Sequence, residues 1–108
     1  MEKWGSFDAG HTIGAFGSEG GTILLDEEHA DGARITIERG GQTAPFAITC
    51  GVYGSMVHTR FFATEAEARD QCDKMKAALS ELIAALHEGE GELKAAGEAC
   101  SRFVDRFP

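Results

Sequence analysis

Cys50 and His58 come closest, by residue type and spacing, to recognisable chemistry in this chain. They lie in the stretch "CGVYGSMVHTRFF", residues 50–62, on either side of a glycine-containing turn. A thiol beside an imidazole can act as a nucleophile with its base, or as two metal ligands. Because side chains alternate between the two faces of a strand, the length of the hairpin loop decides whether these two residues meet.

Two loop lengths are compatible with this hairpin. A loop of even length, with Gly54 in its centre, puts Cys50 on the core face and His58 on the opposite face. A three-residue loop, 53–55, puts His58 directly opposite Cys50 and sets Arg60 among core residues. The even loop separates polar from apolar side chains better, so we expect it. The sequence then predicts no catalytic residue here, since a core thiol without a neighbouring base is not a nucleophile.

The even loop also predicts a mixed polar and apolar face of the kind that binds a protein partner. We expect this partner-binding face to consist of five residues: Tyr53, Met56, His58, Arg60 and Phe62. The alternative is a small-molecule pocket between sheet and helices, in a ligand-binding protein or an enzyme, with His58 as its polar group. A closed cavity lined by His58 and Tyr53 would favour that alternative, and a flat exposed face would favour the protein partner.

No metal or cofactor motif accompanies these residues, and we expect neither. The four histidines have no partner at ligand spacing. The acidic run "DEEHAD", residues 26–31, lacks the spacing of a calcium loop, and alternation sends its neighbours to opposite faces. It is expected to be a solvated hairpin end. The glycine-rich "GAFGSEGG", residues 14–21, has no phosphate-loop lysine.

Composition narrows the classes of partner. The chain of 108 residues has 18 acids and 10 bases, a net charge of −8, and its bases are scattered. This argues against nucleic acid and fits solubility or a basic protein partner. No apolar run reaches the roughly 18 residues of a membrane span, and the opening residues lack the apolar core of a secretory signal. We therefore expect a cytoplasmic protein whose cysteines are reduced. Each cysteine falls among the apolar residues of its strand or helix: Cys50, Cys72 and Cys100.

The two halves of the sequence predict a single α+β domain over residues 1–108. Residues 1–63 are rich in glycine, β-branched and aromatic residues, which is typical of strands. They predict an antiparallel β-meander of four to five strands. Residues 64–108 are rich in Ala, Glu, Leu and Lys and predict a long amphipathic helix over 64–88 and a shorter helix over 92–106. Strands followed by helices favour helices packed on one sheet.

The clearest hairpin lies in residues 21–41. A three-residue loop with Gly32 in the left-handed region pairs Leu25 with Ile37, which gathers the apolar side chains. It also pairs Glu28 with Arg34. One buried face is expected to contain Ile23, Leu25, Ile35 and Ile37. Upstream, residues 11–17 are expected to form a further strand.

The long helix has a clear beginning and end. Thr64 is the expected N-cap, with Glu67 completing a capping box, and Gly89 is a natural stop before a linker over residues 88–92. The expected apolar stripe consists of Ala68, Cys72, Met75, Leu79, Leu82 and Leu86.

These observations favour a small acidic, non-enzymatic interaction protein in a chaperone-like or immunity-like role. We expect the chain to bury Phe103 and Phe107 of the second helix and to associate as a homodimer. Because the first helix already covers the sheet, the second needs another apolar surface. A twofold contact between copies supplies one, and such contacts are the commonest in oligomers.

Overall fold

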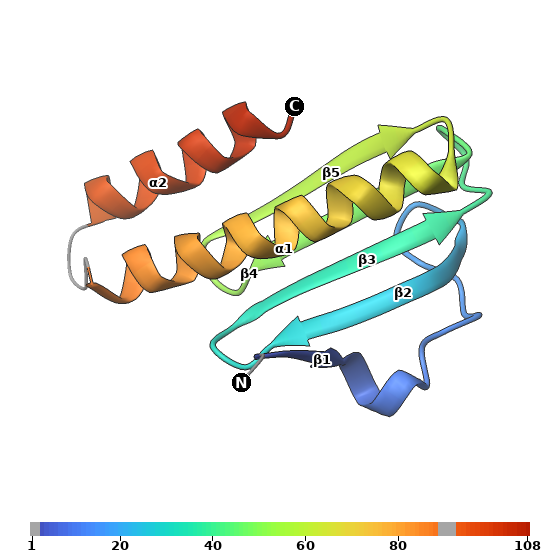
Figure 1. Cartoon of the computed structure of the whole chain (residues 1–108), viewed down its shortest axis with the longest axis horizontal. Helices are drawn as coiled ribbons and strands as arrows, with labels where there is room; N and C mark the ends of the chain where they lie inside the picture. Colours follow the sequence, from blue (N-terminus) through green and yellow to red (C-terminus); the bar gives the residue numbers. More distant parts are fainter. Residues whose placement is uncertain (1–2, 89–92) are drawn as a thin grey trace.

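An antiparallel meander and two helices make up the structure, a computed structural model that describes residues 3–88 and 93–108. The sheet has five strands in the order β1-β2-β3-β4-β5, and both helices pack on the same side of it (Figure 1). This confirms the predicted α+β fold. The elements are β1 (Trp4–Ser6), β2 (Thr22–His29), β3 (Ala33–Arg39), β4 (Phe46–Val52), β5 (Met56–Phe62), α1 (Glu65–Glu88) and α2 (Leu93–Arg106).

The β2–β3 hairpin has the expected loop. Leu25 pairs with Ile37, and Gly32 has a φ of 112°, in the left-handed region. The prediction is wrong for Ile23. A β-bulge between Ile23 and Leu25 shifts the register, so that Ile23 pairs with Glu38 and lies on the side of the sheet away from the helices.

Residues 7–21, which we call the arm, do not form the expected strand. They contain a short 3-10 segment, Phe7–Gly10, and a single bridge between Phe16 and Thr22. The arm folds back over the bulged end of β2, where the Gly14 N–H donates to the carbonyl of Ile23 at 2.9 Å. The bulge turns Ile23 toward the arm, which covers it, so Ile23 is only 6 % exposed.

The β4–β5 hairpin has the three-residue loop, so the expected even register is wrong. Cys50 pairs with His58, and the pairing runs without a shift from Val52–Met56 to Phe46–Phe62. Gly54 in the loop has a φ of 77°. Thus His58 and the alternate residues of β5 point toward the helices.

The charge of Arg60 explains why the expectation failed. Arg60 was placed outside because it is charged, yet it lies on the helix side opposite Ile48. Its Nε donates to the carbonyl of Pro108 at 3.0 Å and its Nη1 to Oε1 of Gln71 at 2.9 Å. Its guanidinium also lies 5.4 Å from the centre of the Phe107 ring. Acceptors on Gln71 and Pro108 bind its N–H groups, and the rings of Phe62 and Phe107 lie beside the guanidinium.

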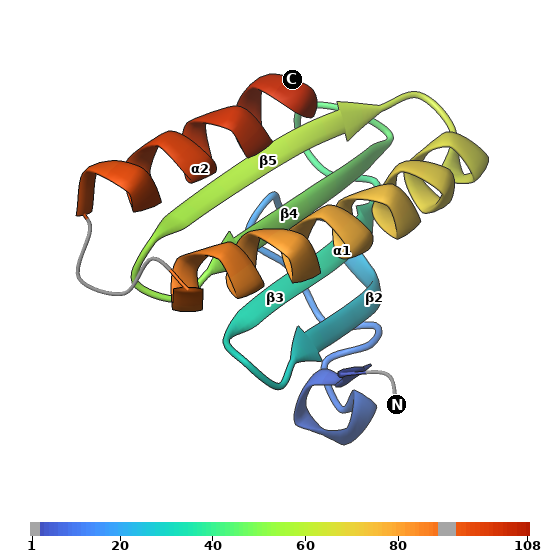
Figure 2. The same cartoon turned by 60° about the vertical axis from the view of Figure 1, so that its left-hand side comes forward.

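Helix α1 crosses the sheet over β3, β4 and β5, and α2 runs alongside it (Figure 2). The Glu67 N–H donates to Oγ1 of Thr64 at 3.3 Å, which confirms the N-cap. The predicted stop at Gly89 and the linker through residue 92 lie outside the described residues. No helix within residues 3–88 and 93–108 is long and apolar enough to cross a bilayer.

Helix α2 docks on its own chain. Phe103 is 5 % exposed and Phe107 is 4 % exposed, and both belong to the core beneath α1. Their expected burial is confirmed. It is achieved within one copy, so these two residues no longer provide a reason for dimerisation.

Gly32 provides a test of the β2–β3 loop. The variant Gly32→Ala should lower the free energy of unfolding by about 1 kcal/mol, because a Cβ disfavours a positive φ. Gly97→Ala is the matched control: Gly97 lies within α2 with open space around it, and alanine favours helix there. Urea unfolding would measure both. A Gly32→Ala variant as stable as the parent would contradict the loop geometry.

Candidate functional site

The structure brings Cys50 and His58 to opposite positions of two strands, where each has surroundings unlike those of a reactive thiol and its base. Burial, with Cys72 nearby, raises the pKa of the Cys50 thiol to about 12. The Nε2 atom of His58 is hydrogen-bonded to the carbonyl of Phe107. In the described part of the chain no hydrogen bond joins the two side chains. The thiol therefore stays protonated, and the imidazole serves to hold the end of α2.

The expected partner-binding face is divided between the two sides of the sheet. Met56, His58, Arg60 and Phe62 lie on the helix side, where Phe62 is only 6 % exposed. Tyr53, in the loop, is 54 % exposed. The pocket that Tyr53 lines does not include His58, so the alternative of a cavity shared by these two residues is wrong for that pocket.

The side of the sheet away from the helices, which we call the open face, is covered over only part of its width. The arm lies over β2 and β3. The register places six residues of β4 and β5 on the open face: Ala47, Thr49, Gly51, Val57, Thr59 and Phe61. None of these six is charged. Val57 is 78 % exposed and Phe61 is 44 % exposed, so two large apolar side chains stand in water.

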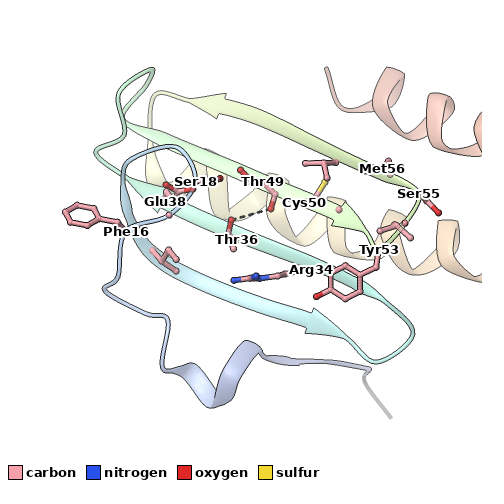
Figure 3. A pocket seen from close by; sticks show the side chains of 16 residues that line it. Phe16, Ser18, Arg34, Thr36, Glu38, Thr49, Cys50, Tyr53, Ser55 and Met56 are labelled. Carbon is pink, nitrogen blue, oxygen red and sulfur yellow. Dashed lines mark hydrogen bonds between the residues drawn. The ribbon is translucent and has the colours of Figure 1, made fainter.

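A hollow of about 680 Å³ lies on this face between the arm and the β4–β5 loop (Figure 3). Thr36, Thr49 and Gly51 contribute to its floor, and Gly51 leaves it without a side chain between Arg34 and Val57. Phe16 and Tyr53 lie at its two ends, and the ring of Phe16 points away from the other labelled side chains. Phe16 is 85 % exposed.

The charged groups beside the hollow have hydrogen-bond partners within the chain. Arg34 binds Asp26 through two hydrogen bonds of 2.9 and 2.6 Å, and this interaction raises the pKa of Arg34. The Tyr53 hydroxyl donates to Glu28 at 2.7 Å. Partial burial and this hydrogen bond raise the pKa of Tyr53 to about 12. The hollow thus offers hydroxyl groups and apolar walls at neutral pH.

The acidic run does not assemble a cation site. Its acids have separate partners on both sides of the sheet, and no cluster of His, Cys, Asp and Glu able to hold a metal occurs among the described residues. The expectation of a solvated hairpin end is wrong for Asp26 and His29, which are buried. The pairs are Asp26–Arg34, Glu27–Lys76, Glu28–Tyr53 and Asp31–Lys3.

Glu38 fixes the arm that forms one wall of the hollow. Its carboxylate is buried, with the residue 1 % exposed, and accepts the N–H groups of Glu19 and Gly21 at 3.1 and 3.0 Å. A Cβ at Gly17 would lie 2.3 Å from the carboxyl carbon of Glu38, so a side chain there would displace the carboxylate. This contact between Glu38 and the arm was not predicted from the sequence. The sequence signal for this contact is Glu38 next to Ile37 in a core strand, downstream of the glycine-rich residues 14–21.

Comparison of the chain with protein-family models, with curated proteins and with solved structures found no match. The candidate site therefore rests on its geometry.

Replacing Glu38 tests its contact with the arm. The variant Glu38→Gln should be less stable by about 1–3 kcal/mol, because charge-assisted hydrogen bonds to the arm are lost and a buried amide lacks acceptors. Hydrogen exchange at the Gly21 amide should accelerate. Glu81→Gln, on the exposed side of α1, is the control and should change neither. Unchanged exchange at Gly21 in Glu38→Gln would show that the carboxylate does not hold the arm.

The cysteines should differ in reactivity. Burial raises the pKa of both Cys50 and Cys72 to about 12, so each should react slowly with a thiol reagent in the native state and fast in denaturant. Cys100 is only half-buried and should label first. Labelling followed by mass spectrometry would measure the order. Fast native labelling of Cys50 would restore the possibility of a catalytic thiol.

Proposed function

We propose that this protein is a small acidic, non-enzymatic interaction module that binds a protein partner on its open face over β4 and β5. One observation carries the proposal: this face is uncharged and exposes large apolar side chains, in a chain of which 26 % of residues are charged. Depletion of charge and exposure of aromatic residues are typical of interface cores. Isolated apolar residues on a surface are common, but exposed apolar residues on an uncharged strand face beside a hollow favour a binding site.

The titratable groups near this face favour recognition over catalysis. Arg34 and Tyr53 have acidic partners, and Cys50 and His58 are held on the helix side of the sheet. A chaperone-like or immunity-like role fits, because it needs shape and apolar contact but no bond-making group. The pairing of Arg34 and the net charge of −8 disfavour nucleic acid as the partner. The three free cysteines fit a reducing compartment such as the cytoplasm.

A small ligand in the hollow is the second candidate. Its volume of about 680 Å³ is within the usual range of ligand pockets. The hydroxyl of Thr49 and the rim residue Tyr53 would suit a flat, mainly apolar molecule with one or two hydrogen-bonding groups. His58, which was expected to be the polar group of such a pocket, is not part of it.

Site-specific photo-cross-linking tests the proposal. A photoreactive amino acid in place of Val57 should form a discrete protein adduct in the native cell, because Val57 is 78 % exposed on the proposed contact surface. The same replacement of Ala66, exposed on α1, is the matched control and should not. Adducts of equal yield at both positions, or none at Val57, would contradict a partner on the open face.

The second candidate gives a different result. If a small molecule fills the hollow, Val57 forms no protein adduct. Native mass spectrometry of the purified parent then shows a bound mass that is lost in Thr49→Val.

A further inference from the structure

The arm and the open face of β4 and β5 are two exposed apolar surfaces, of which the arm is raised and the strand face lies lower. The arm is raised above β2 and β3 and exposes Ile13 and Phe16, at 50 % and 85 %. Beside it, the open face of β4 and β5 exposes Val57 and Phe61, although Ala47 is buried. A raised apolar strip next to an apolar trough of similar length can bind a second copy of itself.

Both surfaces lack charge. Residues 11–18 of the arm contain no Asp, Glu, Lys or Arg, and neither do the six open-face residues of β4 and β5. Two copies with a net charge of −8 each repel one another over most of their surface. Along this path few like charges come together, and Arg34, the cation that lines the hollow, is paired with Asp26.

We infer that two copies of this chain pack open face to open face around a twofold axis that runs parallel to the strands. The axis lies between the arm and the uncovered strands, so that the arm of each copy covers β4 and β5 of the other. Phe16 of each copy then contacts Phe61 of its partner, and the hollow is filled reciprocally. Such a contact closes after two copies, because the same surface is used on both.

The arm already makes a contact of this kind in its own chain. It lies on the open side of β2 and β3, where it buries Ile23 and is fixed by Glu38. Packed sheets are about 10 Å apart, and in the dimer the two arms occupy the space between them. Each arm therefore covers β2 and β3 of its own chain and, in the dimer, also β4 and β5 of the partner.

The dimensions indicate a moderate affinity. Strands of seven residues span roughly 23 Å at about 3.3 Å per residue. Two such strands and one arm from each copy bury an area near the lower end of specific interfaces, about 1,200 Å². We expect a dissociation constant in the micromolar range. This inference rests on the proposed function, since it uses the same face and names the partner as a second copy.

Sedimentation velocity of the full chain tests the dimer. Across the micromolar to millimolar range the parent should change from monomer to dimer and stop there. Phe16→Lys and Phe61→Glu should each weaken the dimer about tenfold or more, because each puts a charge into the centre of the contact. Ala66→Lys, on the exposed side of α1, is the control and should leave the dimer unchanged.

Mixing the two variants tests the contact itself. A dimer of one Phe16→Lys chain and one Phe61→Glu chain keeps one Phe–Phe contact and replaces the other by opposite charges. The mixture should therefore dimerise better than either variant alone. An equally weak mixture would overturn the contact between Phe16 and Phe61.

Disulfide trapping gives the same test in covalent form. In a Cys100→Ser background, Phe16→Cys and Phe61→Cys chains should form a mixed disulfide faster than two Phe16→Cys chains do. Equal rates would overturn the proposed axis, which separates the two copies of Phe16.

Three results of sedimentation would overturn the inference: a monomer at all concentrations, growth beyond the dimer, or a dimer unaffected by both charged variants. Failure here is separable from failure of the proposed function. If the chain is monomeric and the photoreactive Val57 variant still captures a different protein, the second copy is excluded while a protein partner on the open face is supported.

Discussion

Arg60 lies on the helix side of β5, where Gln71 and the carbonyl of Pro108 receive its guanidinium, and this arrangement is tied to which residues of β5 face the helices. The side chains of a strand alternate, so a shift of one residue in β5 would exchange its two sides. Arg60 and His58 would then face water, and Val57 and Phe61 would be buried. In the observed register a charge is satisfied beneath α2, and the side left in water is uncharged. The candidate binding face is thus a consequence of how one cation is accommodated.

Features set by neighbouring residues could be predicted from the sequence. The capping pair at Thr64 and Glu67 and the apolar repeat that follows them locate α1. The glycine at position 32 and the pairing of Leu25 with Ile37 determine the β2–β3 loop. In each case the signal and the structure lie within one element or one hairpin. Local propensity and pattern are sufficient there.

Features set by distant partners could not. Arg60 and Pro108 are 48 positions apart, so the sequence shows a charged residue in an apolar strand but not the carbonyl that receives it. Ile23 fits the alternation of β2, and only the arm above it makes a bulge and a change of side favourable. Glu38 looks like a solvent-facing residue until the N–H groups of the arm are placed around it. The candidate site is built from these distant contacts, so the strands and helices could be predicted from the sequence better than the side chains that form the binding surface.

The hydrogen bond from Trp4 to Ser80 joins residues 76 positions apart, so during translation it can form only after α1 has been synthesised. When β1 leaves the ribosome, its anchor on α1 has not been synthesised. The meander is synthesised next, and its core residues Ile35, Ile37 and Ile48 are exposed to water until the helix covers them. Nascent chains with an uncovered apolar sheet are prone to aggregate. Any slowing of translation before α1 has left the ribosome would prolong that interval.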